Sequence, residues 1–173
     1  MKWTGFIVLS LLLLATSCAP APTTMPTGKS PQNVIPLSVP GFTFIEKSDR
    51  VNMPFDGVDY WAYSLFEPQI GSEFYGKVLN LEVRVHKCND ETAAEEIFSA
   101  MAEGGTTREE IQLDKVNAML TYDEDFGETA VFWWQGNLVI LSDAIPPFEA
   151  TIFDEQSLKR AALEGAKATA KNL

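Results

Sequence analysis

The sequence predicts an α+β fold, with one domain built on a mainly antiparallel sheet of about five to six strands and one or two covering helices. Three observations support it. Short segments rich in β-favouring residues alternate with turn signals, and two other segments repeat apolar residues at the helical period. The predicted order, β-β-β-α-β-β-β-α, groups strands in runs, which is typical of antiparallel sheets covered by helices.

The first three strands are expected at Phe42–Ile45, Asp59–Glu67 and Val78–His86. The first two are rich in aromatic and other β-favouring residues. In the third, leucine and valine alternate with polar residues from Leu79 onward. That strand should bury one face and turn the other toward solvent.

A helix is predicted next, because apolar residues recur at i, i+3, i+4 and i+7, at Ala94, Ile97, Phe98 and Met101. It should begin near Asp90, with glutamates at its positive end, and end at Gly104-Gly105.

Three more strands are expected at Lys115–Tyr122, Glu128–Trp134 and Leu138–Ser142, joined by tight turns at 123–127 and 135–137. The last two strands are apolar on both faces, which predicts a central, doubly covered position. A second helix is expected over Glu155–Asn172 with Asp154 as its N-cap. Small residues along its apolar stripe favour close packing on a sheet.

The N-terminus indicates secretion. Lys2 precedes Phe6–Ala15, an apolar run that would reach only about half of a ~30 Å hydrocarbon core, as in a signal peptide. The end of this run, Ala15-Thr16-Ser17-Cys18, resembles the lipobox of prokaryotic lipoprotein precursors. The resemblance implies that Cys18 receives a diacylglycerol-type lipid, with acyl chains such as palmitate, and becomes the new N-terminus. An ordinary signal peptide cut near Ser17 or Ala19 is the alternative, and it would leave a soluble secreted protein.

We therefore expect a signal peptide at 1–17, lipidated Cys18 with a proline-rich tether at 18–40, and a folded domain at 41–173. Six of the ten prolines lie between Ala19 and Gly41, which favours an extended chain. The expected location is the extracytoplasmic face of the cell envelope. In a cell with two membranes, Ala19 after the cysteine implies, by the same resemblance, the outer-membrane side.

The charge of the chain limits its partners. Removing Lys2 from the 13 basic residues leaves 12 against 24 acidic residues. This balance opposes nucleic acid and anionic lipid headgroups, so membrane contact is expected only through the lipid on Cys18. A protein partner or a small ligand remains open, and no cofactor is expected.

Cys88 has no intramolecular disulfide partner if Cys18 carries lipid. It is then a buried small hydrophobe, an intermolecular disulfide partner or a reactive thiol. The single histidine, His86, lies two residues earlier on the polar side of its strand, so the two side chains point the same way. A Cys88/His86 thiol or hydrolase site is one alternative, and a solvated strand end is the other. Neither HExxH nor CxxC is present.

Three further groups have a structural and a functional alternative. Asp123, Asp125 and Glu128 lie in an acidic turn, which is either a polar hairpin or a weak Ca²⁺ site, although the EF-hand spacing is absent. The aromatic residues Trp61 and Trp133 belong to the core or form a stacking platform for a ligand. Phe148, after Ile145-Pro146-Pro147, either staples the last helix to the sheet or forms an exposed contact.

The order of elements resembles that of α-β-α sandwiches of the PsbP and Mog1 type, which include lipoproteins of unassigned function. The leading hypothesis is a non-catalytic, membrane-anchored domain that binds a partner protein or a small ligand. An enzyme using Cys88 and His86, or a Ca²⁺-binding surface protein, is the alternative.

Overall fold

The computed structural model describes residues 30–51, 57–103, 107–150 and 152–173. Within them the strands are β1 (Phe42–Val51), β2 (Val58–Pro68), β3 (Asn80–Cys88), β4 (Thr107–Leu113), β5 (Val116–Tyr122), β6 (Thr129–Gln135) and β7 (Leu138–Ile145). The helices are α1 (Pro31–Val34), α2 (Glu91–Ala102) and α3 (Glu155–Ala170).

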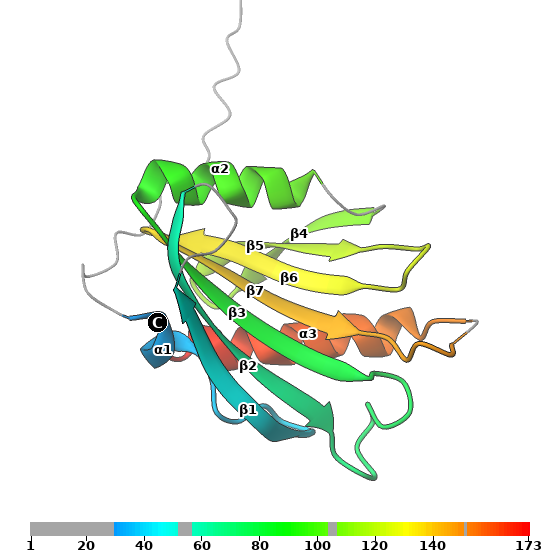
Figure 1. The fold of residues 1–173 in the computed structure, drawn as a ribbon. Coiled ribbons are helices and arrows are strands. Elements are labelled where there is room, and N and C mark those ends of the chain that lie inside the picture. The colour runs from blue at the N-terminus through cyan, green and yellow to red at the C-terminus, as the bar shows by residue number, and fades with distance from the viewer. Residues whose placement is uncertain (1–29, 52–56, 104–106, 151) are drawn as a thin grey trace, which may run out of the picture.

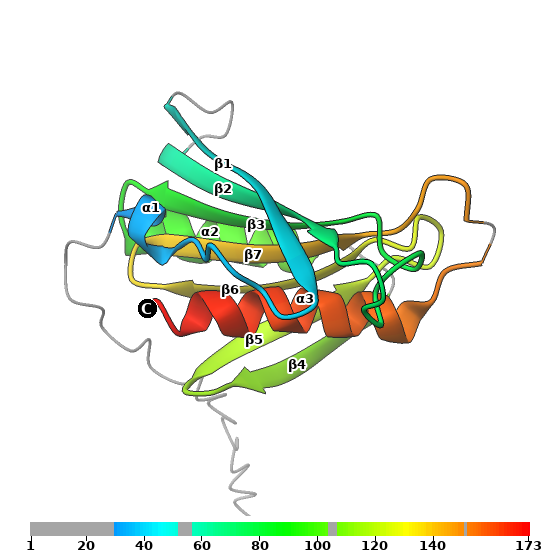
Figure 2. The same ribbon diagram turned by 90° about the horizontal axis from the view of Figure 1, so that it is seen from below.

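All seven strands form one antiparallel sheet in the order β1-β2-β3-β7-β6-β5-β4, with β7 at its centre. Helix α3 lies along one face of the sheet, with the short α1 beside it, and α2 lies on the opposite face (Figures 1 and 2). The predicted α+β class and the central, doubly covered position of β6 and β7 are confirmed.

The sheet has one strand more than predicted. Strand β4 follows α2 at the edge of the sheet and pairs only with β5. Of its seven residues, Leu113 is buried, Ile111 is half-buried and the rest are exposed. An edge strand with so little apolar content has no alternating pattern to identify it, because pairing with β5 rather than side-chain burial holds it in place.

The folded domain begins earlier than predicted. Residues 31–40 are expected in a tether, yet Val34, Ile35 and Val39 are at most 3% exposed and belong to the core. Pro31 does not prevent this packing, because it occupies the first turn of α1, where a missing N–H costs nothing. The signal peptide, Cys18 and the helix end at Gly104-Gly105 lie outside the described residues.

The predicted N-cap of α3, Asp154, is present, and Asp90, near which the first long helix is expected to begin, is the N-cap of α2. The Asp90 carboxylate accepts a hydrogen bond from Ala93 N at 2.8 Å, and the Asp154 carboxylate accepts one from Ser157 N at 3.1 Å. A cap of this kind satisfies one of the backbone donors that the first turn leaves unpaired. Among the described residues, no helix is long and apolar enough to cross a membrane.

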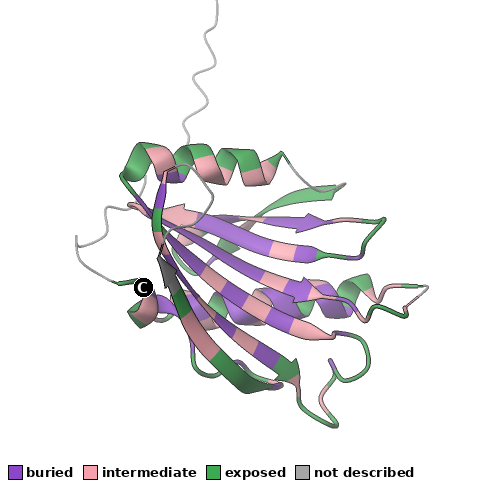
Figure 3. Ribbon diagram, in the orientation of Figure 1, coloured by how far each residue is buried: buried purple, intermediate pink, exposed green. Residues whose placement is uncertain are grey.

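The main core lies between α3 and the sheet. Alternate residues of β3, Leu81, Val83 and Val85, are fully buried on this face, as Figure 3 shows for the central strands. Helix α3 approaches closely at Gly165. A Cβ atom there would collide with Ser142 Oγ and lie 3.2 Å from a methyl group of Leu81.

This close approach predicts that Gly165→Ala destabilises the protein by about 1–3 kcal/mol through overpacking, although alanine favours a helix by about 1 kcal/mol. Urea unfolding measures the change. Ser142→Ala should recover most of the loss, because it removes a buried hydroxyl that has no hydrogen-bond partner among the described residues. A stabilising effect of Gly165→Ala in the unmodified background would contradict this account.

Candidate functional site

A cavity of about 220 Å³ opens on the α2 side of the sheet, at the C-terminal end of that helix. The helix contacts β3, β6 and β7, and its last turn supplies Met101 to the cavity wall. Strands β5, β6 and β7 and the turn between β5 and β6 supply the remaining side chains, which are Thr121, Asp123, Glu128, Ala130, Phe132, Leu141 and Asp143.

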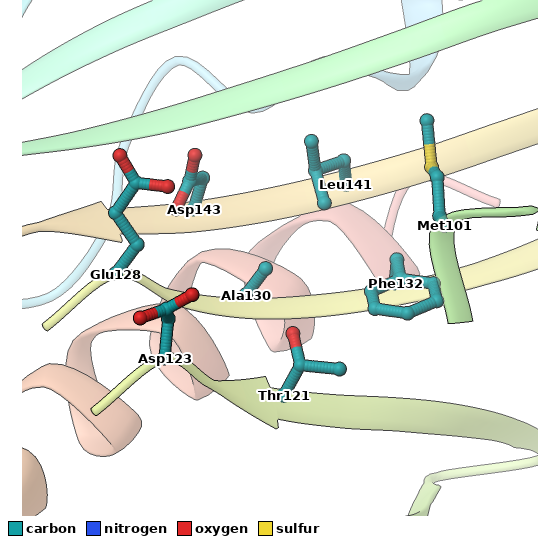
Figure 4. A pocket seen from close by; sticks show the side chains of 8 residues that line it. All are labelled: Met101, Thr121, Asp123, Glu128, Ala130, Phe132, Leu141 and Asp143. Atoms are coloured by element: carbon teal, nitrogen blue, oxygen red, sulfur yellow. The ribbon is translucent and has the colours of Figure 1, made fainter. Parts of the chain in front are cut away.

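The cavity has an apolar and an acidic end. In Figure 4, Met101, Phe132 and Leu141 lie together, and the carboxylates of Asp123, Glu128 and Asp143 lie at the other end. No lysine or arginine is among the lining residues. The lining therefore suits a group that combines apolar surface with a positive charge or hydrogen-bond donors.

Strand register places a charged cluster beside the acidic end. Glu82 of β3 pairs directly with Asp143 of β7, and Arg84 lies one step further along the same face of β3. Arg84 Nη2 contacts Asp143 Oδ2 at 3.1 Å, and Arg84 Nε lies 3.3 Å from Glu82 Oε1. One arginine therefore bridges two carboxylates that would otherwise repel each other.

Asp143 is the most perturbed carboxyl group of the cavity. Its side chain is only 15% exposed, and its Oδ1 atom is buried without a hydrogen-bond partner among the described residues. Burial raises the pKa of Asp143 to about 6, and the attraction of Arg84 offsets only part of that rise. An added positive group in the cavity would favour the ionised form.

The acidic turn is held by hydrogen bonds between the Asp123 side chain and the backbone that follows it. Asp123 Oδ1 accepts hydrogen bonds from the backbone N–H groups of Asp125 and Phe126, at 2.9 and 3.0 Å. Asp125 is exposed and does not line the cavity. In the described parts of the chain, no three His, Cys, Asp or Glu side chains are grouped closely enough to hold a metal ion. The structure thus joins Asp123 and Glu128 with Asp143, rather than with Asp125 as the Ca²⁺ hypothesis requires.

His86 and Cys88 are buried, at 3% and 0% exposure, so the expected solvated strand end is wrong. The His86 ring stacks on Trp61 with centroids 5.8 Å apart, and neither ring nitrogen has a hydrogen-bond partner among the described residues. Burial, followed by repulsion from Arg84, lowers the pKa of His86 to about 4. Burial, followed by two nearby carboxylates, raises the pKa of Cys88 to about 11. A thiolate–imidazolium pair needs the opposite shifts, so this environment does not favour an activated thiol.

The three aromatic candidates do not come together. Trp133 is fully buried on the α3 side, in the core, whereas Trp61 stacks with His86 on the α2 side and is 8% exposed. Phe148 lies between β7 and α3 and is 89% exposed, which agrees with the contact alternative. The stapling role falls instead to Phe153, whose ring packs on Gly127 and on the core.

Several cavity residues were not among the sequence candidates, chiefly Asp143, Phe132 and Leu141. One signal was present, because Asp143 is the single charged residue in the mostly apolar segment of β7. A carboxylate in such a strand requires a partner or an opening to solvent. Arg84 reaches Asp143 because β3 pairs with β7. No local sequence pattern predicts that pairing, because the two strands are far apart in the chain.

No family model and no curated protein matches the chain. Among solved structures, it is similar to the crystal structure of a GTP binding regulator from Thermotoga maritima, with a TM-score of 0.51 and 13% sequence identity. The match covers 86% of this chain and 93% of that one. At this identity the likeness shows a shared fold alone.

Two buried groups give the free energy of unfolding opposite pH dependences. The pKa of His86 is about 4 in the folded protein against an ordinary 6.5, so the unfolded chain takes up the proton first and stability falls as pH drops from 6.5 toward 4. The pKa of Asp143 is about 6 against 3.8, so the folded protein keeps its proton longer and stability falls as pH rises from about 4 to 6. Each effect amounts to about 3 kcal/mol.

Single substitutions should therefore separate the two effects. We expect His86→Phe, which keeps the stacking on Trp61, to lose stability as pH rises from 4.5 to 7, because only the Asp143 effect remains. Asp143→Asn should gain stability over the same range, and the unsubstituted protein should change least. Urea unfolding at three pH values measures this, and three parallel profiles would disprove it.

Proposed function

We propose that this chain is a non-catalytic binding domain held at the extracytoplasmic face of the cell envelope by a lipid on Cys18. The observation that supports the binding role is the open cavity at the end of α2, whose lining offers both apolar surface and carboxylates. The lipobox-like Ala15–Cys18 and the prolines that follow it support the anchoring part.

The charge of the site favours neutral or cationic binding partners. The structural neighbour is described as binding GTP, but three carboxylates line this cavity without a lysine or arginine, and the chain carries a formal charge of −11. Phosphate groups would be repelled in such a field. We therefore do not extend nucleotide binding to this chain.

Anchoring predicts that Cys18→Ser moves the protein from the membrane fraction to the soluble fraction, because the thioether to the lipid can no longer form. Cell fractionation with immunoblotting measures the shift. Cys88→Ser is the matched control and should leave the protein in the membrane fraction. Unchanged fractionation of Cys18→Ser would refute lipid anchoring.

The competing thiol enzyme makes a different prediction for Cys88. In the Cys18→Ser protein Cys88 is the single thiol, since the chain has two cysteines. Its burial and raised pKa should keep it unreactive toward a chromogenic disulfide reagent until the protein is unfolded in denaturant. Rapid labelling of the native protein at pH 7 would instead support the enzyme.

A further inference from the structure

Exposed apolar side chains concentrate in three loops: residues 69–79, residues 123–128, and residues 146–150 with 152–154. Among the described residues, eight large apolar side chains are exposed, and five of them are in these loops. Their exposed fractions run from 57% to 89%, for Ile70, Tyr75, Phe126, Phe148 and Ile152. Single exposed apolar residues are common on protein surfaces, but a set gathered at one end of a fold indicates contact with another molecule.

The strand register shows that the three loops leave the same end of the sheet. Asn80, at the start of β3, pairs with Ile145 at the end of β7, and Thr129, at the start of β6, pairs with Ala144. The described residues of these loops therefore extend from one end of the sheet, and both ribbon views place them together on the right (Figures 1 and 2). We call this end the loop surface.

The loop surface lies opposite the ends of the folded chain. Helix α1, where the described chain begins, and the C-terminus are at the other end of the sheet in both views. A hydrogen bond of 3.0 Å from Asn172 Nδ2 to Val34 O holds these two segments together. A tether that enters at α1 would thus leave the loop surface facing away from its attachment point.

The loop surface is acidic as well as apolar. The three loops contain seven acidic residues and one basic residue, Lys77. Lys77 forms an ion pair of 3.2 Å with Asp154, and Arg160 of α3 pairs with Glu73. Both of these positive side chains are thus already paired with carboxylates. The acidic end of the cavity, with Asp123, lies at this same end of the sheet.

We propose that the loop surface docks a protein partner whose own surface combines apolar side chains with lysine or arginine. The apolar tips contact the partner's apolar residues, and the acidic loops with the adjoining cavity receive its cationic groups. The inference rests on the proposed role as a binding domain and names its partner class. Anionic membrane is disfavoured as the occupant, because the acidic loops would repel its headgroups.

The test uses a synthetic amphipathic peptide of lysine and leucine as the probe, with the Cys18→Ser protein so that neither lipid nor detergent contributes. Isothermal titration calorimetry measures the Kd. We expect Phe148→Ser/Ile152→Ser to weaken binding about tenfold, which corresponds to about 1.4 kcal/mol. Asp125→Asn/Glu149→Gln should weaken it severalfold, and less so at high salt, where charges are screened.

Matched controls carry the same changes elsewhere on the exposed surface. Leu37→Ser, between α1 and β1, removes an exposed apolar residue, and Glu109→Gln/Glu110→Gln removes two exposed carboxylates of β4. Both should keep the Kd within about twofold. All these positions are exposed, so circular dichroism should show folded proteins in every case.

Three results would overturn the inference: equal losses in the controls, equal binding of a peptide with glutamate in place of lysine, or preferential binding to vesicles of zwitterionic lipid. The last would identify a membrane surface as the occupant. Because the titration uses protein without lipid, its failure is distinct from a failure of anchoring, which fractionation of Cys18→Ser reports separately.

Discussion

The contact between α3 and the sheet is the interaction on which the rest of the structure depends. The helix buries a stripe of mostly small residues, Ser157, Leu158, Ala161, Ala162, Gly165, Ala166 and Thr169. Small side chains let its backbone come close enough for the strands' valines, leucines and Trp133 to fill the remaining space. The N-terminal segment around Val34 closes the same core from one end. Stability is thus concentrated on one face of the sheet.

The other face is correspondingly free to carry polar groups. Helix α2 buries a smaller set there, Val58, Cys88, Ala94 and Val139. Beyond it, Arg84 and Asp143 occupy positions that would be apolar in a fully covered sheet, and each needs the other because neither is well hydrated. His86 lies on the same face, buried against Trp61. Burial lowers the pKa of its imidazole, so the side chain is neutral near pH 7. Unequal coverage of the two faces therefore leaves room for the cavity at the end of α2.

Elements with strong periodicity were predictable from the sequence. The two long helices and six of the seven strands follow from local pattern, because burial on one side imposes a repeat. The start of α2 near Asp90 and the N-cap Asp154 of α3 were predictable as well. The edge strand β4 was not predictable, because its pairing with β5 holds it in place. The buried segment after Pro31 was not predictable either, because it is held by packing against residues far away in the chain. The candidate site was predicted only at Asp123 and Glu128. The burial of His86 and the role of Asp143 depend on neighbours distant in the chain, which no local pattern encodes.

The hydrogen bond between Asn172 and Val34 brings the two ends of the folded domain together. Chains with adjoining ends tolerate circular permutation, in which the ends are joined and new ones are opened in an exposed loop. Opening the chain at Gly71, which is exposed between β2 and β3, would reverse the orientation of the domain relative to anything attached to its new ends. The same sheet and core could then be attached by either end. The fold of the domain therefore does not determine which of its ends points away from the attachment.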